Sequence, residues 1–298
     1  MINKTYDIAA LEPYINWLYF YHAWGLSGKP KEEKLKLRHE AEGMLQSWYA
    51  DYHTHALFGL FQAVSDGDDI IIEGKLRFPM LRQQHPTALG QPNLCLADFL
   101  CPKDRILVLD GKSAQNGGGT GESANAACPG IAHHLGVFCT TVDAAITEAY
   151  RHDEYQRMMA QTLCDRLAEA TAEKLHEEVR RKKDYWGYAP DEQLTIEQQH
   201  REEYQGIRPA IGYPSLPDTS ANFIIDQLLD MKQVGIRLTE TGMMTPHASV
   251  SGLMFAHSKA RYFELGKIGD DQLRDYARRR GVPVELMRTF LQSSLLKK

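Results

Sequence analysis

The stretch Ala56-Leu57-Phe58-Gly59-Leu60-Phe61-Gln62-Ala63-Val64, followed by Ser65-Asp66-Gly67-Asp68 and then Asp69-Ile70-Ile71-Ile72, decides the class of fold. Both apolar runs are rich in β-branched and aromatic residues, which favour strands. An Asp-Gly pair between two such runs is typical of a tight hairpin turn. The pattern therefore predicts two antiparallel strands, over residues 56–64 and 69–76.

Helical periodicity lies on both sides of this hairpin. Leu37, Ala41 and Trp48 recur at the spacing of one helix face, and a longer apolar stripe runs from Asp153 to Lys183. We therefore expect helices over residues 12–26, 31–52, 153–183, 196–204, 220–234, 270–280 and 283–291. Further β-prone runs predict strands over residues 105–109, 135–141, 236–240, 248–256 and 262–268.

The order of these elements indicates the fold class. Strands and helices do not alternate regularly, as they would in a parallel βαβ fold. We expect an α+β protein, a single domain with a mostly antiparallel central sheet, long helices and closing helices at the C-terminus. That one domain is predicted to take up the whole chain, residues 1–298. Residues 110–130 are rich in Gly, Ser and Asn, so we expect them to form a flexible insert.

Composition argues against several classes of protein. A net charge of −5 at pH 7 gives no reason to expect nucleic acid as a partner. The sequence has no apolar run long enough to cross a membrane and no signal-peptide pattern at its start. Five cysteines at irregular spacing predict reduced thiols rather than a disulfide framework. These features favour a cytoplasmic protein with no nucleic-acid or membrane partner.

The glycine-rich insert offers one alternative function. Gly119-x-Gly121-x-x-Ala124 matches a relaxed dinucleotide-binding pattern, which would make residues 113–126 part of a nucleotide-dependent enzyme. That fingerprint needs its glycines directly between a strand and a helix. Here the nearest expected strand ends before the insert, and the residues after Gly121 form a poor helix, so the context argues against nucleotide binding.

Histidine patterns offer another alternative. Asp51-Tyr52-His53-Thr54-His55-Ala56 approaches the Asp-x-His-x-x-Gly signature that supplies a histidine to cobalamin, but the glycine is missing. The pairs His53/His55 and His133/His134 have no Cys or carboxylate partner at metal-ligand spacing. We therefore predict no metal site, and the sequence contains none of the common nucleophile motifs that would identify a catalytic residue.

Residues 208–214 form the other distinctive stretch, Arg208-Pro209-Ala210-Ile211-Gly212-Tyr213-Pro214. Each proline fixes its own φ and holds the residue before it in an extended conformation. Gly212 permits a turn or a close approach that a side chain would block. The loop is expected to present the guanidinium of Arg208, which suits a carboxylate, and the ring of Tyr213, which suits a cation. An ordinary surface turn with an incidental arginine is the alternative interpretation of this loop.

Several stretches, taken together and in order, resemble the C-terminal activation domain of cobalamin-dependent methionine synthase. The segment from Tyr204 to Pro214 is similar to that family's Arg-x-x-x-Gly-Tyr segment. The other similar stretches after Asp153 are Asp165-Arg166-Leu167-Ala168-Glu169-Ala170 with Leu175-His176-Glu177, Tyr185-Trp186-Gly187-Tyr188-Ala189-Pro190, Leu238-Thr239-Glu240 with Ala248-Ser249-Val250-Ser251-Gly252, and Asp275-Tyr276-Ala277-Arg278-Arg279. Earlier similarity is weaker and covers Ile15-Asn16-Trp17 through Gly28-Lys29 and Leu94-Cys95-Leu96-Ala97-Asp98-Phe99.

The resemblance implies an activity. In that family the domain binds S-adenosylmethionine and supports the reductive methylation of cob(II)alamin, with a flavodoxin-type donor supplying the electron. The chain would then be a reactivation module, a subunit or domain of a cobalamin-dependent methyltransferase rather than a complete enzyme. Its cofactors would be S-adenosylmethionine and a cobalamin carried by a partner, a methionine synthase subunit or another corrinoid protein. Because the homocysteine, folate and cobalamin modules are absent from the sequence, we expect it to act in trans.

The resemblance also implies the residues of the site. Arg208 would bind the methionine carboxylate of the ligand, and the backbone of Ala210 would contact it. Tyr262 and Phe263 match a Tyr-Tyr pair that borders the ligand in the family. The full set of ligand-binding residues predicted in this way is Arg208, Ala210, Gly212, Tyr213, Tyr262, Phe263, Asn16, Glu169 and Glu202.

Asn16 departs from the family pattern, which has an aspartate that binds the ligand at this position. Loss of one charge-assisted hydrogen bond, worth about 1.5–3 kcal/mol, predicts an affinity weaker by about one to two powers of ten. Asn16 also motivates the alternative hypothesis. The chain could be a non-enzymatic docking module for a corrinoid protein that has kept the fold and no longer binds S-adenosylmethionine.

Overall fold

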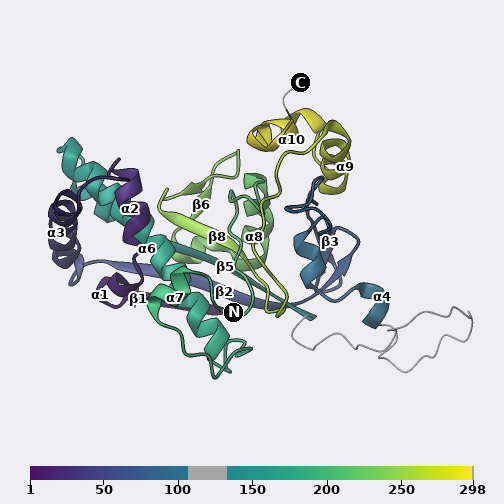
Figure 1. The fold of residues 1–298 in the computed structure, drawn as a ribbon, viewed down its shortest axis with the longest axis horizontal. Helices are drawn as coiled ribbons and strands as arrows, with labels where there is room; N and C mark the ends of the chain where they lie inside the picture. The colour runs from purple at the N-terminus through teal and green to yellow at the C-terminus, as the bar shows by residue number, and fades with distance from the viewer. Residues whose placement is uncertain (107–132, 297–298) are drawn as a thin grey trace, which may run out of the picture. The chain divides into compact units, whose positions relative to one another are not determined.

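The hairpin expected around residues 56–76 is present, and it lies within the main sheet (Figure 1). Strands β2 (His53–Asp66) and β3 (Asp69–Ile72) pair antiparallel with Asp66 opposite Asp69. Gly67, in the turn, has a φ of 62°, which glycine adopts without strain. A third strand, β4 (Leu76–Pro79), pairs antiparallel with β3. The sequence pattern does not separate it from the strand before it.

The computed structural model describes residues 1–106 and 133–296. In the main sheet the strands follow the order β4-β3-β2-β5-β8, and β1 also pairs with β2. The pairings of β1 with β2 and of β6 with β7, which form a separate two-stranded sheet, are antiparallel as well. The remaining strands are β1 (Ile2–Asp7), β5 (His134–Val142), β6 (Arg237–Leu238), β7 (Met244–Thr245) and β8 (Ser249–Met254).

Helices account for most of the rest of the described chain. The α-helices are α1 (Ile8–Leu11), α2 (Trp17–Ala23), α3 (Lys31–Trp48), α4 (Lys103–Ile106), α5 (Ala145–Ala149), α6 (Glu154–Arg181), α7 (Ile196–His200), α8 (Asn222–Leu229), α9 (Asp270–Arg280) and α10 (Val284–Phe290). The short 3-10 helices are η1 (Glu12–Tyr14), η2 (Leu96–Phe99), η4 (Thr219–Ala221), η5 (Met231–Val234) and η6 (Gln292–Ser294). The fold is therefore α+β with a mostly antiparallel sheet, as the sequence predicted.

Backbone contacts divide the chain into two compact units. Unit 1 consists of Met1–Gly59, Val137–Tyr204 and Ser220–Gly252, and unit 2 of Leu60–Gly136, Gln205–Thr219 and Leu253–Lys298. That residues 1–298 form one domain stays a prediction, and the insert expected at residues 110–130 lies outside the described residues.

Helix α6 is the centre of unit 1. It contacts α1, η1, α2, α3 and α5, and Figure 1 shows α1, α2 and α3 near it. Leu163, Leu167 and Leu175 on its apolar stripe are completely buried. The carboxylate of Asp153 accepts a hydrogen bond from the backbone N–H of Gln156 at 2.9 Å, so it caps the start of the helix. The predicted helix 153–183 is confirmed.

Unit 2 has its own apolar core beneath the two C-terminal helices. Leu273 and Tyr276 of α9 pack with Met287 of α10 and with Leu265 and Ile268 from the segment that precedes them. The alternation of charged and apolar residues in α9 explains this packing, because its apolar side chains fall on one face. These two closing helices match the predicted ranges.

Three of the predicted helices are shorter than expected, two because of a side-chain hydrogen bond and one because of the backbone. Residues 12–26 are interrupted because Asn16 caps a new helix, α2, by accepting a hydrogen bond from the N–H of Leu18 at 3.1 Å. Residues 220–234 are interrupted at Asp230, whose φ is 51°, and the carboxylate of Asp226 binds the N–H of Met231 there. The helix expected over 196–204 ends at His200, because the backbone becomes left-handed two residues later, at Glu202.

Two predicted strands are wrong in the described residues. Arg105 and Ile106 belong to helix α4, and the rest of the strand expected over 105–109 lies outside the described residues. Residues 262–268 form no strand, because Gly266 within them has a left-handed φ of 74° and only isolated hydrogen bonds join them to other segments. Leu265 N–H donates to Pro214 O at 3.0 Å, and Ile268 N–H donates to Ser294 O at 2.9 Å.

The cysteines only partly match the expectation of reduced thiols. Cys95, Cys139 and Cys164 are free and buried, whereas Cys101 takes part in a disulfide. Burial raises the pKa of the Cys139 and Cys95 thiols to about 12, so both are protonated at neutral pH. Within the described residues, no helix has both the length and the apolar character needed to span a membrane.

Candidate functional site

The segment 208–216 in unit 2 consists of two successive tight turns. Tyr213 N–H donates to Ala210 O at 3.3 Å, and Gly212, the third residue of that turn, has a φ of 88°. A turn with positive φ at its third residue selects glycine there. Leu216 N–H then donates to Tyr213 O at 2.9 Å, with Pro214 in the second position of this turn. Proline favours that position, so local sequence accounts for both turns.

Backbone hydrogen bonds attach the start of this segment to β8 and to Phe255, the residue that follows β8. Ile207 and Phe255 exchange backbone hydrogen bonds of 2.9 and 3.0 Å, and Leu253 N–H donates to Pro209 O at 3.0 Å. Arg208 therefore lies between two anchored residues, and its backbone cannot move independently of them.

Arg208 and Tyr262 are brought together. The N–H of Arg208 donates to the hydroxyl of Tyr262 at 2.8 Å, across 54 residues of sequence. Arg208 is 7% exposed, Phe263 8% and Ala210 6%, whereas Tyr213 is 48% exposed. The structure therefore places six of the nine predicted residues in unit 2. Four of them lie in the anchored loop, and Tyr262 lies beside it. Within the loop, the ring of Tyr213 reaches solvent. Phe263 follows Tyr262 directly.

A buried polar group beyond the loop was missed in the sequence. Asp218, which follows the loop, accepts a hydrogen bond from the hydroxyl of Tyr276 at 2.8 Å, and Nε of Arg280 lies 3.6 Å from the same carboxylate. Burial and the neighbouring Asp218 carboxylate raise the pKa of Tyr276 well above its ordinary value. Because 58 residues separate Asp218 from Tyr276, no local pattern could have paired them. The group fixes the exit of the loop to α9.

The other three predicted residues belong to unit 1 and lie on separate elements. Asn16 is the N-cap of α2, and its side-chain oxygen accepts a hydrogen bond from the N–H of Leu18. Glu169 is half-buried on α6. Glu202 is exposed and has a left-handed φ of 58°. Their predicted role in binding a ligand stays a prediction.

The backbone around Glu202 closes helix α7. Glu203 N–H donates to Gln198 O at 3.1 Å, and Glu202 N–H donates to Gln199 O at 2.9 Å. These two bonds define a Schellman motif, in which the left-handed residue is usually glycine. A glutamate in this position is strained by roughly 1–2 kcal/mol, and such strain is concentrated at functional sites.

The acidic face of α6 that includes Glu177 is partly buried. Glu177 binds the hydroxyl of Tyr14 and, at 2.9 Å, Arg181. Burial opposes the ionisation of Glu177, but these donors and Lys174 outweigh it, so its pKa is lowered. This part of the face is an internal ionic contact rather than a solvated surface.

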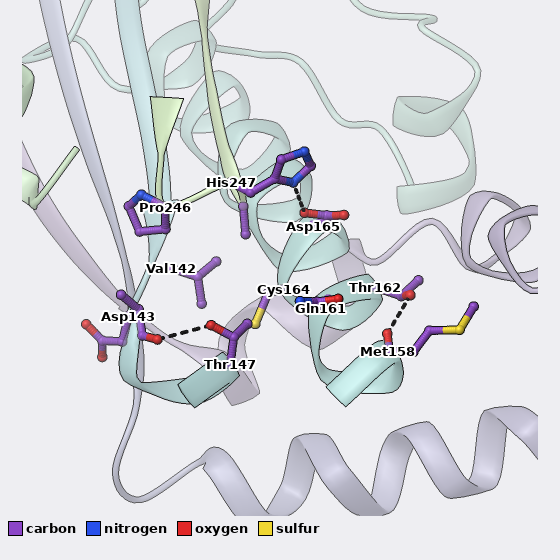
Figure 2. Close-up of a pocket in the computed structure, with 12 residues that line it drawn as sticks. Val142, Asp143, Thr147, Met158, Gln161, Thr162, Cys164, Asp165, Pro246 and His247 are labelled. Carbon is purple, nitrogen blue, oxygen red and sulfur yellow. Dashed lines mark hydrogen bonds and ion pairs between the residues drawn. The ribbon is translucent and has the colours of Figure 1, made fainter. Parts of the chain in front are cut away.

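A pocket of about 500 Å³ lies elsewhere in unit 1 (Figure 2). It is formed by the end of β5, by α5, by the first half of α6 and by residues 246–248. Asp143, Asp165 and His247 supply its charged and titratable side chains. None of the nine predicted ligand residues lines it, so it is distinct from the site expected from the sequence.

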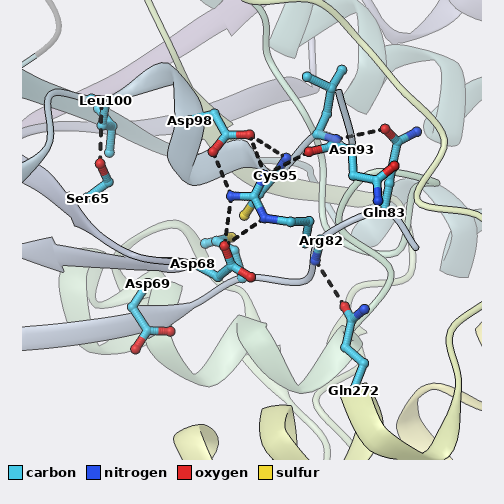
Figure 3. A network of polar contacts seen from close by, with 12 residues as sticks. Ser65, Asp68, Asp69, Arg82, Gln83, Asn93, Cys95, Asp98, Leu100 and Gln272 are labelled. Atoms are coloured by element: carbon cyan, nitrogen blue, oxygen red, sulfur yellow. Dashed lines mark hydrogen bonds and ion pairs between the residues drawn. The ribbon is translucent and has the colours of Figure 1, made fainter. Parts of the chain in front are cut away.

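A second polar cluster, in unit 2, is structural (Figure 3). The guanidinium of Arg82 binds both oxygens of Asp98 at 2.6 and 2.8 Å and Oδ1 of Asp68 at 2.8 Å. The backbone N–H of Arg82 donates to Gln272 of α9 at 3.0 Å. Every charge in the cluster has an opposite partner, and its hydrogen bonds join η2, the hairpin and α9. We therefore assign it to stability.

The histidines of β2 pair with carboxylates that are distant in sequence. Nε2 of His55 lies 2.8 Å from Asp143, and Nε2 of His53 lies 3.4 Å from Asp7. Among residues 1–106 and 133–296, no group of three or more His, Cys, Asp or Glu side chains is arranged to hold a metal ion.

Comparison with known proteins identifies the class to which this fold and loop belong. A protein-family model described as "Vitamin B12 dependent methionine synthase, activation domain" matches residues 7–281. A solved structure described as "Crystal Structure of the MetH Reactivation Domain bound to AdoHcy" superposes with a TM-score of 0.82 at 36% identity. That match covers 100% of this chain and 90% of the other.

Both comparisons point to the activation, or reactivation, domain of methionine synthase. The chain belongs to the family of vitamin B12 dependent methionine synthase activation domains. The resemblance inferred from the ordered motifs is thereby confirmed.

Proposed function

We propose that this chain binds S-adenosylmethionine at the Arg208–Pro214 loop and supports the reductive methylation of cob(II)alamin held by a partner protein. Its family and a relative bound to AdoHcy, the molecule that remains when S-adenosylmethionine has lost its methyl group, support this function. The observation that carries the proposal is a nearly buried arginine at the start of an anchored loop that also presents an exposed tyrosine.

The loop suits the amino-acid end of S-adenosylmethionine. The ligand carries a carboxylate, which a guanidinium binds with two parallel hydrogen bonds. Arg208 is 7% exposed, and a charged hydrogen bond is stronger where little water competes for it. The ligand also carries a sulfonium, and the exposed ring of Tyr213 offers a face that attracts a cation.

The reaction requires positioning rather than acid–base chemistry. When held by the partner, the cobalamin would supply a reduced metal centre able to accept a methyl group, with the electron coming from a flavodoxin-type donor. This chain would hold S-adenosylmethionine as the methyl donor, and loss of its methyl group would leave AdoHcy in the site. No proton moves in that transfer, so the loop contributes by holding the methyl donor in line. Anchored backbone at Ile207 and Pro209 is what such a role needs.

Calorimetry with S-adenosylmethionine tests the binding step. We expect saturable binding to the wild-type chain and an affinity about 30-fold weaker or worse for Arg208→Ala, because removing one partner of a buried charge pair costs about 2 kcal/mol or more. Arg274→Ala is the matched control, since Arg274 is exposed on α9 of the same unit. Absence of heat with wild-type protein at millimolar ligand would overturn the proposal.

The three residues of unit 1 are tested one at a time. Asn16→Asp restores the carboxylate of the family pattern while keeping a good N-cap for α2. If the residue at this position contacts the ligand, the substitution strengthens binding by about tenfold or more. Glu169→Gln and Glu202→Gln are expected to weaken binding. An unchanged affinity in any of them removes that residue from the proposed site.

Action in trans is tested with a separate corrinoid protein. Methionine synthase that lacks its own activation domain is oxidised to the cob(II)alamin form and supplied with a reduced flavodoxin and S-adenosylmethionine. Addition of this chain should restore methyl transfer, and Arg208→Ala should not. Failure of the wild-type chain to restore turnover, with S-adenosylmethionine binding intact, would reject the trans role alone.

The alternative is a docking module that no longer binds S-adenosylmethionine, and Asn16 in place of the aspartate of the family pattern motivates it. This module would bind the corrinoid protein with the same affinity in the presence and absence of S-adenosylmethionine. Arg208→Ala would leave that affinity unchanged.

A further inference from the structure

The unit 1 pocket has the size of a small-molecule site. Its volume of about 500 Å³ falls inside the range of about 300–1,000 Å³ that is usual for ligand pockets. Figure 2 shows Asp165 on α6 with His247 beside it, and Asp143 on the opposite wall near α5. Two neighbouring parts of the chain, the end of β5 and α6, therefore bring two carboxylates to one cavity.

The lining is anionic. No Lys or Arg is among the twelve residues that line the pocket. Both carboxylate oxygens of Asp143 have partners on β2. Oδ2 accepts a hydrogen bond from the N–H of His53 at 2.7 Å, and Oδ1 lies 2.8 Å from Nε2 of His55. Asp165 is engaged more weakly, since its Oδ1 lies 3.4 Å from Nδ1 of His247 and its side chain is 36% exposed. Asp165 is thus the carboxylate available to a ligand.

The rest of the lining decides which cation fits. Val142, Met158 and Ala248 give the pocket apolar wall. No Phe, Tyr or Trp lines it, which removes the ring faces that quaternary ammonium ligands require. A carboxylate instead favours an ammonium with N–H groups to donate.

We propose that this pocket binds a small primary aliphatic amine, with its ammonium donating to Asp165 and its carbon chain against Val142 and Met158. The site goes beyond the proposed S-adenosylmethionine site and does not depend on it, because it shares no residue with the predicted set. It lies one helical turn from Glu169 on α6, which is the predicted ligand residue nearest in sequence.

A probe series of equal shape tests the proposal. Pentylamine, 1-pentanol and pentanoate are titrated into protein labelled with ¹³C at the methionine methyl groups, and the signal of Met158 is followed. We expect saturable shifts with pentylamine and much weaker responses to the neutral and anionic probes. Asp165→Asn should weaken pentylamine binding by about tenfold or more, because it removes a charge-assisted hydrogen bond.

Three further variants test whether pentylamine binds in this pocket. Asp184→Asn changes an exposed carboxylate just beyond α6 and should leave pentylamine binding unchanged. Gln161→Trp, at an exposed position on the lining, should block the pocket without altering its charge. Arg208→Ala should have no effect, so failure here and failure of the proposed function are distinguishable. Equal responses to pentylamine and pentanol, or an unchanged response in both Asp165→Asn and Gln161→Trp, would overturn the proposal.

Discussion

The turns at residues 185–190 and 208–214 have similar sequences and different surroundings. Each contains a Gly-Tyr pair with a left-handed glycine, and φ is 64° at Gly187 and 88° at Gly212. In unit 1 the turn folds back onto the end of α6, where Gly187 N–H donates to Val179 O at 2.9 Å. The hydroxyl of Tyr188 lies 3.0 Å from Nε2 of the buried His176. This first turn is a helix cap with its tyrosine used internally.

The turn in unit 2 has backbone hydrogen bonds of its own as well as bonds to neighbouring segments, and it presents its tyrosine. Gly212 N–H donates to Leu216 O at 2.8 Å, and Tyr213 is 48% exposed. The two glycines also differ in the space around them. A Cβ at Gly187 would lie 2.7 Å from Cα of Lys183, whereas a Cβ at Gly212 would meet nothing closer than Thr219 Cγ2 at 4.0 Å. Conformation selects glycine at both positions, and packing selects it at only the first.

Gly187→Ala is expected to have the largest effect. A side chain there adopts a left-handed conformation, at about 1–2 kcal/mol, and overlaps backbone that cannot swing aside, at about 1–3 kcal/mol. We expect the free energy of unfolding to fall by about 3 kcal/mol in urea denaturation. Gly43→Ala is the control, because Gly43 lies within α3 with open space around it. This variant should be more stable than the wild-type protein by about 0.5–1 kcal/mol. A wild-type midpoint for Gly187→Ala would contradict the packing argument.

Glu178 near the same turn is expected to make stability depend on pH. Burial opposes its ionisation, but Lys4 at 2.8 Å, Tyr6 at 2.9 Å and Lys182 at 3.1 Å outweigh burial and lower its pKa. A lowered folded-state pKa gives stability that is present above the unfolded pKa of about 4.3 and is lost as pH falls through the folded value. Glu178→Gln should cost about 1.5–3 kcal/mol at pH 7 and much less at pH 3.

Unfolding free energies measured across that pH range check this prediction. Glu240→Gln, an exposed glutamate in the same unit, is the matched control and should leave the pH profile unchanged. An equal loss for Glu178→Gln at both pH values would mean that its charge is not what stabilises unit 1.

Gly212→Ala should have a smaller effect on stability. The left-handed strain of about 1–2 kcal/mol is partly offset by the reduced freedom of the unfolded chain, about 0.4–1 kcal/mol, which leaves a loss of about 1 kcal/mol. Gly67→Ala is the matched control in unit 2, since Gly67 is also left-handed and has open space around it. We expect similar losses of stability for both, and weaker S-adenosylmethionine binding in calorimetry only for Gly212→Ala. Weaker binding in both would indicate a general loss of structure.

Local pattern was sufficient for much of the fold. The Asp66-Gly67 turn, the stripe of α6 and the Pro214 turn are each specified by neighbouring residues, and the structure contains all three. Prediction failed where one side chain outweighed propensity. The carboxylate of Asp226 accepts a hydrogen bond from the N–H of Met231. This bond ends the helix, although the apolar periodicity of residues 220–234 predicts that it continues.

The candidate site was predictable in part for the same reason. The chain around Arg208 is shaped by its own prolines and by Gly212, so its turns follow from sequence. The contact between Tyr262 and Arg208 spans 54 residues of sequence, so no local pattern contains it. Only the family resemblance suggested Tyr262.

Glu202→Gly extends the comparison of left-handed positions to a residue where glycine is missing. Glu202 closes α7 at a φ of 58°, and the released strain of about 1–2 kcal/mol exceeds the added freedom of glycine in the unfolded chain, about 0.5–1 kcal/mol. We expect a variant that is more stable by about 0.5–1 kcal/mol in urea denaturation.

If the carboxylate of Glu202 also contacts S-adenosylmethionine, Glu202→Gly binds that ligand more weakly, and Glu203→Gly, at the next and unstrained position, does not. Higher stability with lower affinity would mean that the glutamate is kept for binding at the expense of the fold. Higher stability with unchanged affinity would remove Glu202 from the proposed site, and a loss of stability would show that its left-handed backbone is not strained.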